Sequence, residues 1–192
     1  MIELLSIDLS NYCSKQCPFC YNHSTREGNT IWKPQEVIAF AADCVKTGGV
    51  KAVSLGGGEP FEYEGVFEVI DALFPLCYLS VTSNGLPLEN PDIWDKLTKH
   101  KPDKIHLTIH QPDHQDEVDR VERQLHQIAG IGITPGVNLL VGADKVEDEV
   151  ILRLFRFRMI MIQRNPIYPI HYYNRKIADS FIYEIVNIYI TR

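Results

Sequence analysis

The chain has 192 residues, of which 45% are hydrophobic and 23% charged, as expected for one globular domain of ordinary size. No low-complexity run is present, which excludes wholesale disorder and fibrous architectures. The net charge of −6 argues against a nucleic-acid partner, because phosphate binding requires a basic face. No apolar stretch approaches the roughly 20 residues that span a bilayer. Glu3 and Asp8 also stand where a signal peptide would be basic and then apolar. We therefore expect a cytoplasmic protein without a membrane partner.

Short apolar runs rich in β-branched residues alternate with segments of helical period. We expect strands at residues 4–9, 52–55, 78–82, 104–110 and 134–141. We expect helices from Pro34 to Gly48-Gly49 and around residues 66–73, 93–97, 118–128 and 146–157. Strands that alternate with helices predict an α/β fold with a parallel sheet or barrel, here of five βα units.

The composition changes after Gly142. No glycine follows that residue, basic side chains outnumber acidic ones over residues 151–192, and Ile and Tyr become frequent. We therefore divide the chain into a barrel-like part, residues 1–158, and an atypical C-terminal segment, residues 159–192. The apolar run Met159–Ile162 is placed to supply a sixth strand. Pro166–Arg192 is expected either to pack loosely or to form one irregular helix around Ile177–Ile190, in a role that covers an open flank. Two explanations stay open: a divergent capping segment, or a natural reading frame or barrel that was interrupted near this point.

Three of the five cysteines fall within eight residues, in the loop that follows the first expected strand. An odd number of cysteines without a signal peptide argues against a disulfide framework, whereas clustered thiols in a reducing compartment hold a metal or do redox chemistry. Cys13, Cys17 and Cys20 could hold a [4Fe–4S] cluster with one iron open to a small molecule. With His23 they could instead form a closed zinc site. The isolated Cys44 and Cys77, which lie in apolar runs, are interpreted as small buried hydrophobic residues.

A second motif, Leu55-Gly56-Gly57-Gly58-Glu59-Pro60, stands where the second expected strand ends. Glycines there let the backbone approach a ligand closely, and the carboxylate of Glu59 offers an acceptor for a cationic amine. Since all strands of a parallel barrel end at one mouth, this loop and the cysteine loop should be neighbours. The pairing of the two loops favours the iron–sulfur interpretation over zinc.

Together, these motifs resemble those of the radical S-adenosylmethionine (SAM) enzymes. The pattern Cys-x₃-Cys-x-aromatic-Cys is similar to the family's cluster-binding signature, and Gly57-Gly58-Glu59-Pro60 is similar to its GGEP motif. The resemblance covers about residues 1–142. It implies a partial (β/α)₅₋₆ TIM-like barrel of parallel strands, incomplete or atypical at its C-terminus. It also implies reductive cleavage of SAM to a 5′-deoxyadenosyl radical that abstracts a hydrogen from a substrate.

Carried over to this chain, the resemblance implies the following contacts. Cys13, Cys17 and Cys20 would bind the iron, Phe19 or Tyr21 would lie near the adenine, and the backbone of Gly57, Gly58 and Glu59 would meet the SAM amine. In the third-strand element, Ser83 and Asn84 are candidate donors to the ribose or carboxylate. Thr108 and His110 on the fourth strand and Asn138 on the fifth are further candidate contacts, although the family's glycine-rich fifth-strand motif is absent in its literal form.

The remaining residues narrow the function only in part. His106 and His110 should point to the same side of their strand, where a hydrogen-bonded structural role is the usual one. The acidic run Asp113–Glu117 suits a helix N-terminus. No cysteine follows Cys77, so auxiliary iron–sulfur domains are not expected. The resemblance implies an electron donor such as flavodoxin or ferredoxin, and an open barrel side favours a peptide or protein substrate. The alternative is a non-catalytic zinc or iron–sulfur binding module, truncated or degenerate.

Overall fold

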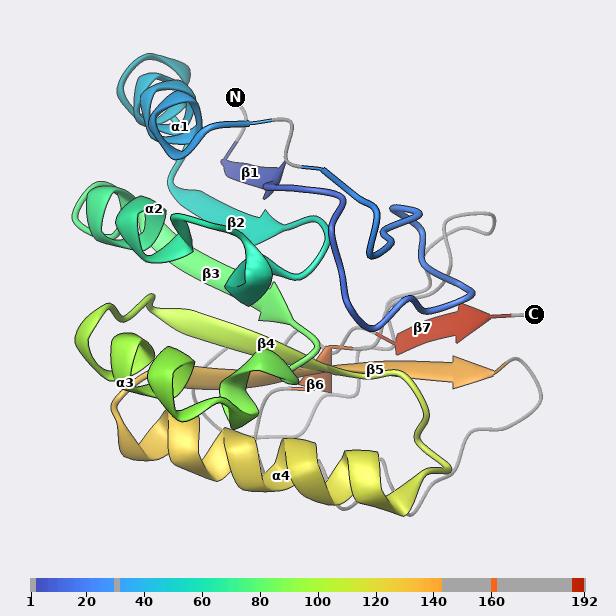
Figure 1. Ribbon diagram of the computed structural model, residues 1–192. Helices are drawn as coiled ribbons and strands as arrows, with labels where there is room; N and C mark the ends of the chain where they lie inside the picture. The colour runs from blue at the N-terminus through green and yellow to red at the C-terminus, as the bar shows by residue number, and fades with distance from the viewer. Residues whose placement is uncertain (1–2, 30–31, 143–159, 162–187, 192) are drawn as a thin grey trace, which may run out of the picture.

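The computed structural model of the chain describes residues 3–29, 32–142, 160–161 and 188–191. In this part of the chain, strands and helices alternate as the sequence predicts (Figure 1). The strands are β1 (Leu4–Asp8), β2 (Ala52–Gly56), β3 (Tyr78–Ser83), β4 (Lys104–Ile109), β5 (Thr134–Gly142), β6 (Ile160–Met161) and β7 (Ile188–Thr191). The α-helices are α1 (Pro34–Gly48), α2 (Val66–Leu73), α3 (Pro91–Lys99) and α4 (Gln115–Gly130), with short 3₁₀ turns η1 (Pro60–Glu62) and η2 (Pro87–Glu89).

Local sequence signals explain where α1 begins and ends. Pro34 occupies the first helical position, where its missing N–H costs nothing, and the backbone N–H of Lys33 donates to the Glu36 carboxylate at 2.9 Å. The helix ends before Gly49, whose φ of 72° lies in the left-handed region that favours glycine. The predicted helix from Pro34 to Gly48-Gly49 is confirmed.

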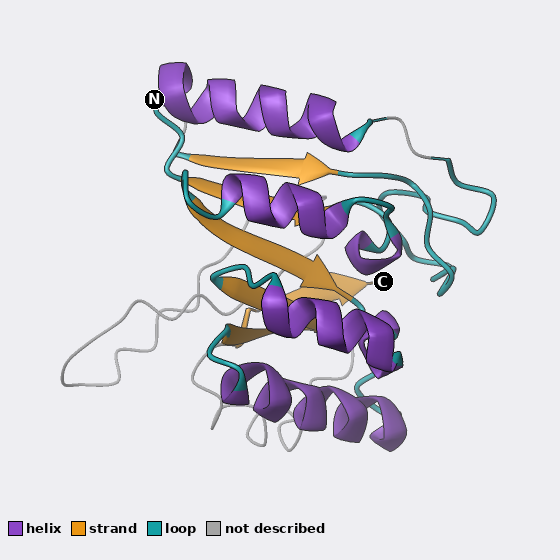
Figure 2. Ribbon diagram, turned by 60° about the vertical axis from the view of Figure 1, so that its left-hand side comes forward, coloured by secondary structure: helices purple, strands orange, loops and turns teal. Residues whose placement is uncertain are grey.

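The strands β1 to β5 pair in chain order, and all pairs are parallel. The sheet is open, since the described strands do not close into a ring. Figures 1 and 2 show α1 to α4 along one face of this sheet. Parallel neighbours joined by right-handed crossovers place their helices in this way. The predicted α/β class with a partial barrel of parallel strands is confirmed.

The two faces of the sheet differ in chemistry. The row Ile7, Leu55, Val81 and Ile105 is aligned by strand register and fully or almost fully buried, as expected for the face covered by helices. The opposite face carries polar or small side chains in register, namely Ser6, Ser54, Ser80 and Lys104 in one row and Thr82, His106 and Gly136 in the next. Parallel sheets are usually apolar and covered on both faces, so a polar second face distinguishes this sheet.

The C-terminal strands both pair with β5. β6 lies beside Val137 and Asn138, at the place where the sequence predicts a sixth strand, and β7 lies beside Leu139–Gly142. The predicted helix over Ile177–Ile190 is therefore wrong for Ile188–Ile190. The reason is the length of the β5 edge. β6 pairs with only two residues of β5, so the backbone groups beyond them are free to pair with the β-branched segment Ile188–Thr191. The predicted helix at 146–157 and residues 166–187 lie outside the described residues.

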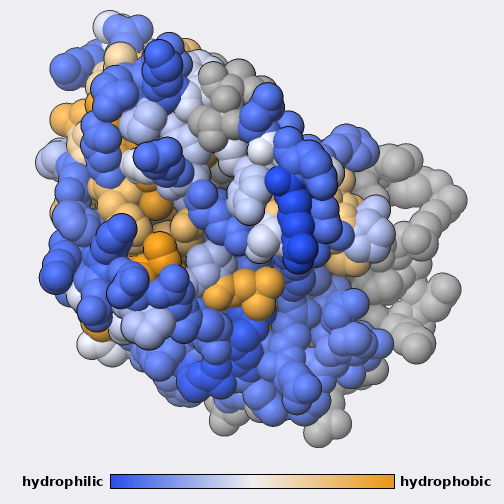
Figure 3. Space-filling model, viewed as in Figure 1, coloured by the Kyte–Doolittle hydropathy of each residue, from blue (hydrophilic) through white to orange (hydrophobic). Residues whose placement is uncertain are grey.

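The face of the molecule shown in Figure 3 is mostly hydrophilic, with hydrophobic side chains in separate patches. Among the described residues, no helix has the length and apolar character needed to cross a membrane. The boundary between residues 158 and 159 stays a prediction.

Candidate active site

The cysteine loop (residues 9–29) is tied to the loop after β2 by backbone hydrogen bonds. The Gly58 N–H donates to the Ser10 carbonyl at 2.7 Å, and the Glu59 N–H donates to the Tyr12 carbonyl at 2.8 Å. Both loops leave the carboxyl ends of neighbouring parallel strands, as expected for the mouth of a barrel. The predicted proximity of the two loops is therefore confirmed.

Glycine is required at two positions of this contact. Gly57 has a φ of 108°, and a Cβ there would lie 2.7 Å from the Ser10 carbonyl oxygen. A Cβ on Gly58 would lie 2.6 Å from the carbonyl carbon of Tyr12 and would overlap its oxygen. The glycines thus let two loops of the chain approach each other closely. The sequence predicted a close approach to a ligand and did not predict this contact between loops.

Glu59 joins these loops to the loop after β3. Its side chain is 1% exposed, and it accepts hydrogen bonds from the Ser83 hydroxyl at 2.7 Å, the Asn84 N–H at 2.8 Å and the Phe61 N–H at 3.2 Å. Burial raises the pKa of Glu59 to about 7, although these hydrogen bonds oppose the shift. Three internal donors therefore already engage this carboxylate, in a role that the sequence did not predict. Its acceptance of a cationic amine stays a prediction.

Ser83 and Asn84 differ in what they leave for a ligand. Ser83 is buried, and its hydroxyl donates to Glu59 and accepts from the Gly85 N–H at 2.9 Å, so it stabilises the loop and offers no spare donor hydrogen. The Asn84 side-chain amide lies 3.7 Å from the Cys13 sulfur, which is within reach of a weak N–H···S hydrogen bond. Asn84 is thus placed at the cysteine loop, beside a predicted iron ligand.

The three clustered cysteines are half-buried free thiols held on tight turns. The Cys13 N–H donates to the Thr25 carbonyl at 2.9 Å, and the Cys20 N–H donates to the Cys17 carbonyl at 3.1 Å. Burial raises the pKa of Cys13 and raises that of Cys17 to about 11, with the charge of Lys15 opposing the latter shift. Thiols of this kind ionise when a positive metal centre compensates the thiolate charge.

Three soft thiolate donors suit a cluster that keeps one iron open. Within the described residues, no group of three or more His, Cys, Asp or Glu side chains is gathered for a single metal ion. This holds for the three cysteines alone and for the alternative zinc site of Cys13, Cys17, Cys20 and His23, so the geometry does not decide between the two. Cys44 and Cys77 are half-buried, and both pack against the hydrophobic core.

The other predicted contacts lie at the mouth and on the polar face of the sheet. Phe19 is 39% exposed, and its ring stacks on that of His110 with centroids 5.9 Å apart, whereas Tyr21 is 74% exposed. Thr108 is half-buried and lies in register with Asn138 on the next strand. Asn138 is 3% exposed, and its side-chain oxygen has no hydrogen-bond partner among the described residues. A buried acceptor without a partner is costly in a native protein, so it marks a position where a ligand donor would be stabilising.

His106 is a second buried group on this face without a partner for one ring nitrogen, Nδ1. Burial lowers the pKa of His106 to about 3, with a smaller contribution from the charge of Lys104, so its ring is neutral. His110 lies just beyond the end of β4, so the expectation that residues 106 and 110 share one side of the strand stays a prediction. Sequence alone did not predict the neutral state, because no residue pattern shows whether a histidine on a strand is buried.

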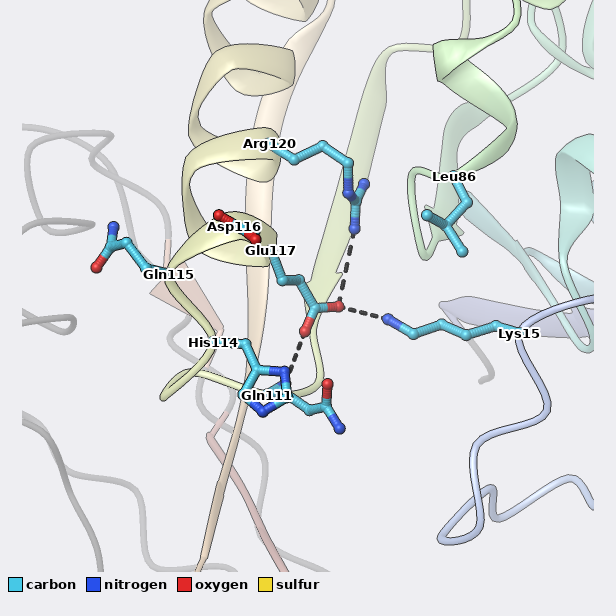
Figure 4. Close-up of a pocket in the computed structure, with 8 residues that line it drawn as sticks. All are labelled: Lys15, Leu86, Gln111, His114, Gln115, Asp116, Glu117 and Arg120. Atoms are coloured by element: carbon cyan, nitrogen blue, oxygen red, sulfur yellow. Dashed lines mark hydrogen bonds and ion pairs between the residues drawn. The ribbon is translucent and has the colours of Figure 1, made fainter.

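A pocket of about 510 Å³ adjoins the cysteine loop at the start of α4 (Figure 4). It is lined by Lys15, Leu86, Gln111, His114, Gln115, Asp116, Glu117 and Arg120. Figure 4 shows Lys15 reaching from the cysteine loop toward Glu117 on α4. Sequence reasoning assigned Glu117 only to the helix N-terminus, where it does lie, and it missed the partner on the cysteine loop. No signal in the sequence links residues so far apart in the chain.

Several curated proteins are similar to this chain in sequence. "Probable GTP 3',8-cyclase" of Methanocella arvoryzae is 26% identical over 159 residues, which are 78% of this chain and 51% of that protein. The protein of the same name from Saccharolobus islandicus is 29% identical over 144 residues, 70% of this chain and 46% of that protein. The chain therefore spans about half the length of the curated relatives it matches.

Solved structures show the same fold at lower identity. SuiB from Streptococcus suis bound to S-adenosylmethionine superimposes with a TM-score of 0.65 at 22% identity, covering 83% of this chain and 38% of that one. A histidine-tagged form of anSMEcpe with bound AdoMet superimposes with a TM-score of 0.61 at 16% identity, covering 82% of this chain and 48% of that one. The sequence profile of the Radical SAM superfamily matches residues 7–158, more than half of the chain. The chain belongs to the radical SAM superfamily, whose enzymes use a [4Fe–4S] cluster and SAM.

Proposed function

We propose that this chain cleaves SAM reductively and uses the radical product to abstract a hydrogen atom from a substrate. Cys13, Cys17 and Cys20 would hold the [4Fe–4S] cluster through their thiolates. A bound cluster supplies one electron to SAM, whose sulfur–C5′ bond breaks to give methionine and a 5′-deoxyadenosyl radical. The electron would come from a donor such as flavodoxin or ferredoxin.

One observation carries the proposal: three loops that bear the family's motifs are joined into one unit. The backbone of Gly58 and Glu59 binds the cysteine loop, the Glu59 carboxylate binds Ser83 and Asn84, and the Asn84 amide reaches the Cys13 sulfur. These contacts preorganise the thiols and the backbone that would meet the SAM amine. Preorganisation lowers the entropy cost of binding a ligand in a reactive geometry.

The polar face of the sheet supports a polar ligand beside this unit. Asn138 and His106 each bury a polar atom that has no partner in the described part of the chain. Thr108 follows His106 by two residues on β4 and lies in register with Asn138 on β5. We assign Asn138 and Thr108 to contacts with SAM or substrate, and Phe19 to the adenine. Tyr21, which is more exposed, is the weaker candidate for the adenine.

For the substrate we propose a peptide or protein. The sheet is open, so a large molecule could reach its polar face from the side. One structure with the same fold is SuiB bound to precursor peptide SuiA, at 23% identity and a TM-score of 0.65. Because curated relatives are named GTP 3',8-cyclases, a nucleotide is the alternative substrate against which a peptide must be tested.

Anaerobic reconstitution with iron and sulfide, followed by dithionite and SAM, tests the proposal. We expect about four irons per chain and release of 5′-deoxyadenosine, both lost in Cys17→Ala. The Cys44→Ala variant is the matched control, because Cys44 packs against the core away from the motifs. A colourless protein with one zinc would overturn the cluster assignment. A cluster that forms without SAM cleavage would indicate the alternative, a non-catalytic iron–sulfur module.

A further inference from the structure

Two consecutive residues of the cysteine loop are held by carboxylates from different elements. Ser14 donates from its backbone N–H to Glu62 at 2.9 Å and also from its hydroxyl to the same carboxylate. Lys15 forms an ion pair with Glu117. Glu62 ends η1 and Glu117 lies in the first turn of α4, so the loop between Cys13 and Cys17 is bound to two different elements.

The Lys15–Glu117 pair is unlike an ordinary surface ion pair. The side chains are only 18% and 10% exposed, whereas those of the Lys51–Glu3 pair are 70% and 64% exposed. Exposed pairs contribute little because water screens them, while removal of one partner from a buried pair leaves an uncompensated charge. The Lys15 pair therefore constrains its loop far more than the Lys51 pair constrains its strand.

Further hydrogen bonds fix the geometry of Glu117. Its second oxygen accepts from the Gln111 N–H at 2.8 Å, and Arg120 lies 3.7 Å from the first oxygen. His110 Nδ1 lies 3.0 Å from the Lys15 ammonium, and the His110 ring stacks on Phe19, which is itself part of the cysteine loop. Figure 4 shows Lys15, from the cysteine loop, and Arg120, from α4 itself, both pointing toward the Glu117 carboxylate. A carboxylate held by several donors is a rigid anchor for the one partner that comes from a loop.

We propose that Glu117 is a positioning residue that captures Lys15 and so sets the conformation of the cysteine loop before the cluster is assembled. The inference rests on the proposed function, since it assigns the loop to a cluster. Most of the loop lacks regular secondary structure, and its thiols would otherwise sample many arrangements. Anchoring Lys15 between Cys13 and Cys17 reduces that freedom at the point where the ligands must converge.

The test compares Glu117→Gln, Lys15→Met, the double variant and the matched control Lys51→Gln. Hydrogen exchange of residues 10–29 is measured in the apo-protein, and the rate of iron incorporation is measured during anaerobic reconstitution. Each single variant should raise exchange in the loop about tenfold or more and slow iron incorporation. The double variant should be no more affected than the more affected single variant, because each single change removes the same contact and the double change leaves no uncompensated charge. Lys51→Gln should behave as wild type.

Two outcomes overturn the proposal. One is unchanged exchange in the loop of Glu117→Gln while exchange in α4 rises, which would show that Glu117 acts only on its own helix. The other is a double variant whose effect is the product of the single effects, which would show that the two residues act independently. A wild-type protein that assembles a cluster but leaves SAM intact would refute the proposed function and leave this inference standing, since loop exchange is read without SAM.

Discussion

Gly58 is the position where one added carbon should separate the two motif loops. In Gly58→Ala the new Cβ would lie 2.6 Å from the Tyr12 carbonyl carbon and 2.9 Å from the Tyr12 nitrogen. These are backbone atoms, so no flexible side chain can turn aside. The nearest atom is the Tyr12 carbonyl oxygen, which the Cβ would overlap. The loops must therefore move apart by about 1.5 Å or more to reach an ordinary contact distance, because packed interiors hold almost no spare space.

That displacement breaks the two hydrogen bonds by which the loops are joined, from Gly58 to Ser10 at 2.7 Å and from Glu59 to Tyr12 at 2.8 Å. Each lost bond costs about 1–3 kcal/mol when its groups stay buried. Replacing glycine by alanine returns about 0.4–1 kcal/mol by restricting the unfolded chain. We therefore expect the free energy of unfolding to fall by about 2–4 kcal/mol.

Urea unfolding of the apo-protein measures this change, and iron content after reconstitution reports on the cysteine loop. Gly48→Ala is the control, because nothing lies within 4 Å of a Cβ at the end of α1 and alanine favours the helix. We expect that control to be as stable as wild type or slightly more stable, with full iron content. A Gly58→Ala protein with wild-type stability and wild-type iron would refute the steric argument.

Three further variants test the polar groups around the site. Between pH 7 and pH 5, the free energy of unfolding in urea should fall less in His106→Gln than in wild type, and the two losses should differ by about 1–2 kcal/mol. The reason is that the folded-state pKa of about 3 lies below the unfolded value, so acid protonates the unfolded chain first; equal losses would contradict it. Asn138→Leu should keep or raise stability, because it removes a buried acceptor without a partner, yet weaken SAM retention in equilibrium dialysis; a lower melting temperature with unchanged SAM retention would contradict both expectations. Gln124→Leu should lose about 2 kcal/mol in thermal unfolding, since the buried amide bonds Gly85 at 2.8 Å and Glu89 at 2.7 Å; a loss below about 0.5 kcal/mol would show that these groups find other partners.

The elements of the fold could be predicted because their signals are local. Proline at the start of α1 and a left-handed glycine after its end mark the helix within a few residues. Apolar and β-branched runs mark β1 to β5, and their alternation with helices specifies parallel order. The C-terminal tail was harder. A helical and an alternating apolar pattern compete there, and the helical one fits the length of the segment better. The edge of β5, which sequence cannot show, pairs with Ile188–Thr191 as a strand instead.

The site was predictable only where a motif has a fixed spacing. The cysteines and the glycines of the second loop were found in this way, but the partner of a carboxylate was not. The sequence around Glu59 is the same whether its carboxylate accepts hydrogen bonds from a ligand or from the next loop. Only the structure shows it buried against Ser83 and Asn84. The Lys15–Glu117 pair joins residues 102 positions apart, a separation that no local pattern encodes.

The acids at the mouth of the sheet have a common role that follows from the loops around them. Irregular loops leave backbone N–H groups without the partners that helices and strands provide, and these groups need acceptors when buried. Glu59, Glu62 and Glu117 each accept from a backbone N–H of a loop, those of Asn84, Ser14 and Gln111. Their carboxylates are therefore engaged in holding the loops. Among the described residues, the groups that we propose for ligands are the thiols and uncharged side chains such as Asn138 and Thr108. This set suits chemistry started by an electron from a cluster better than chemistry that needs a carboxylate to move a proton.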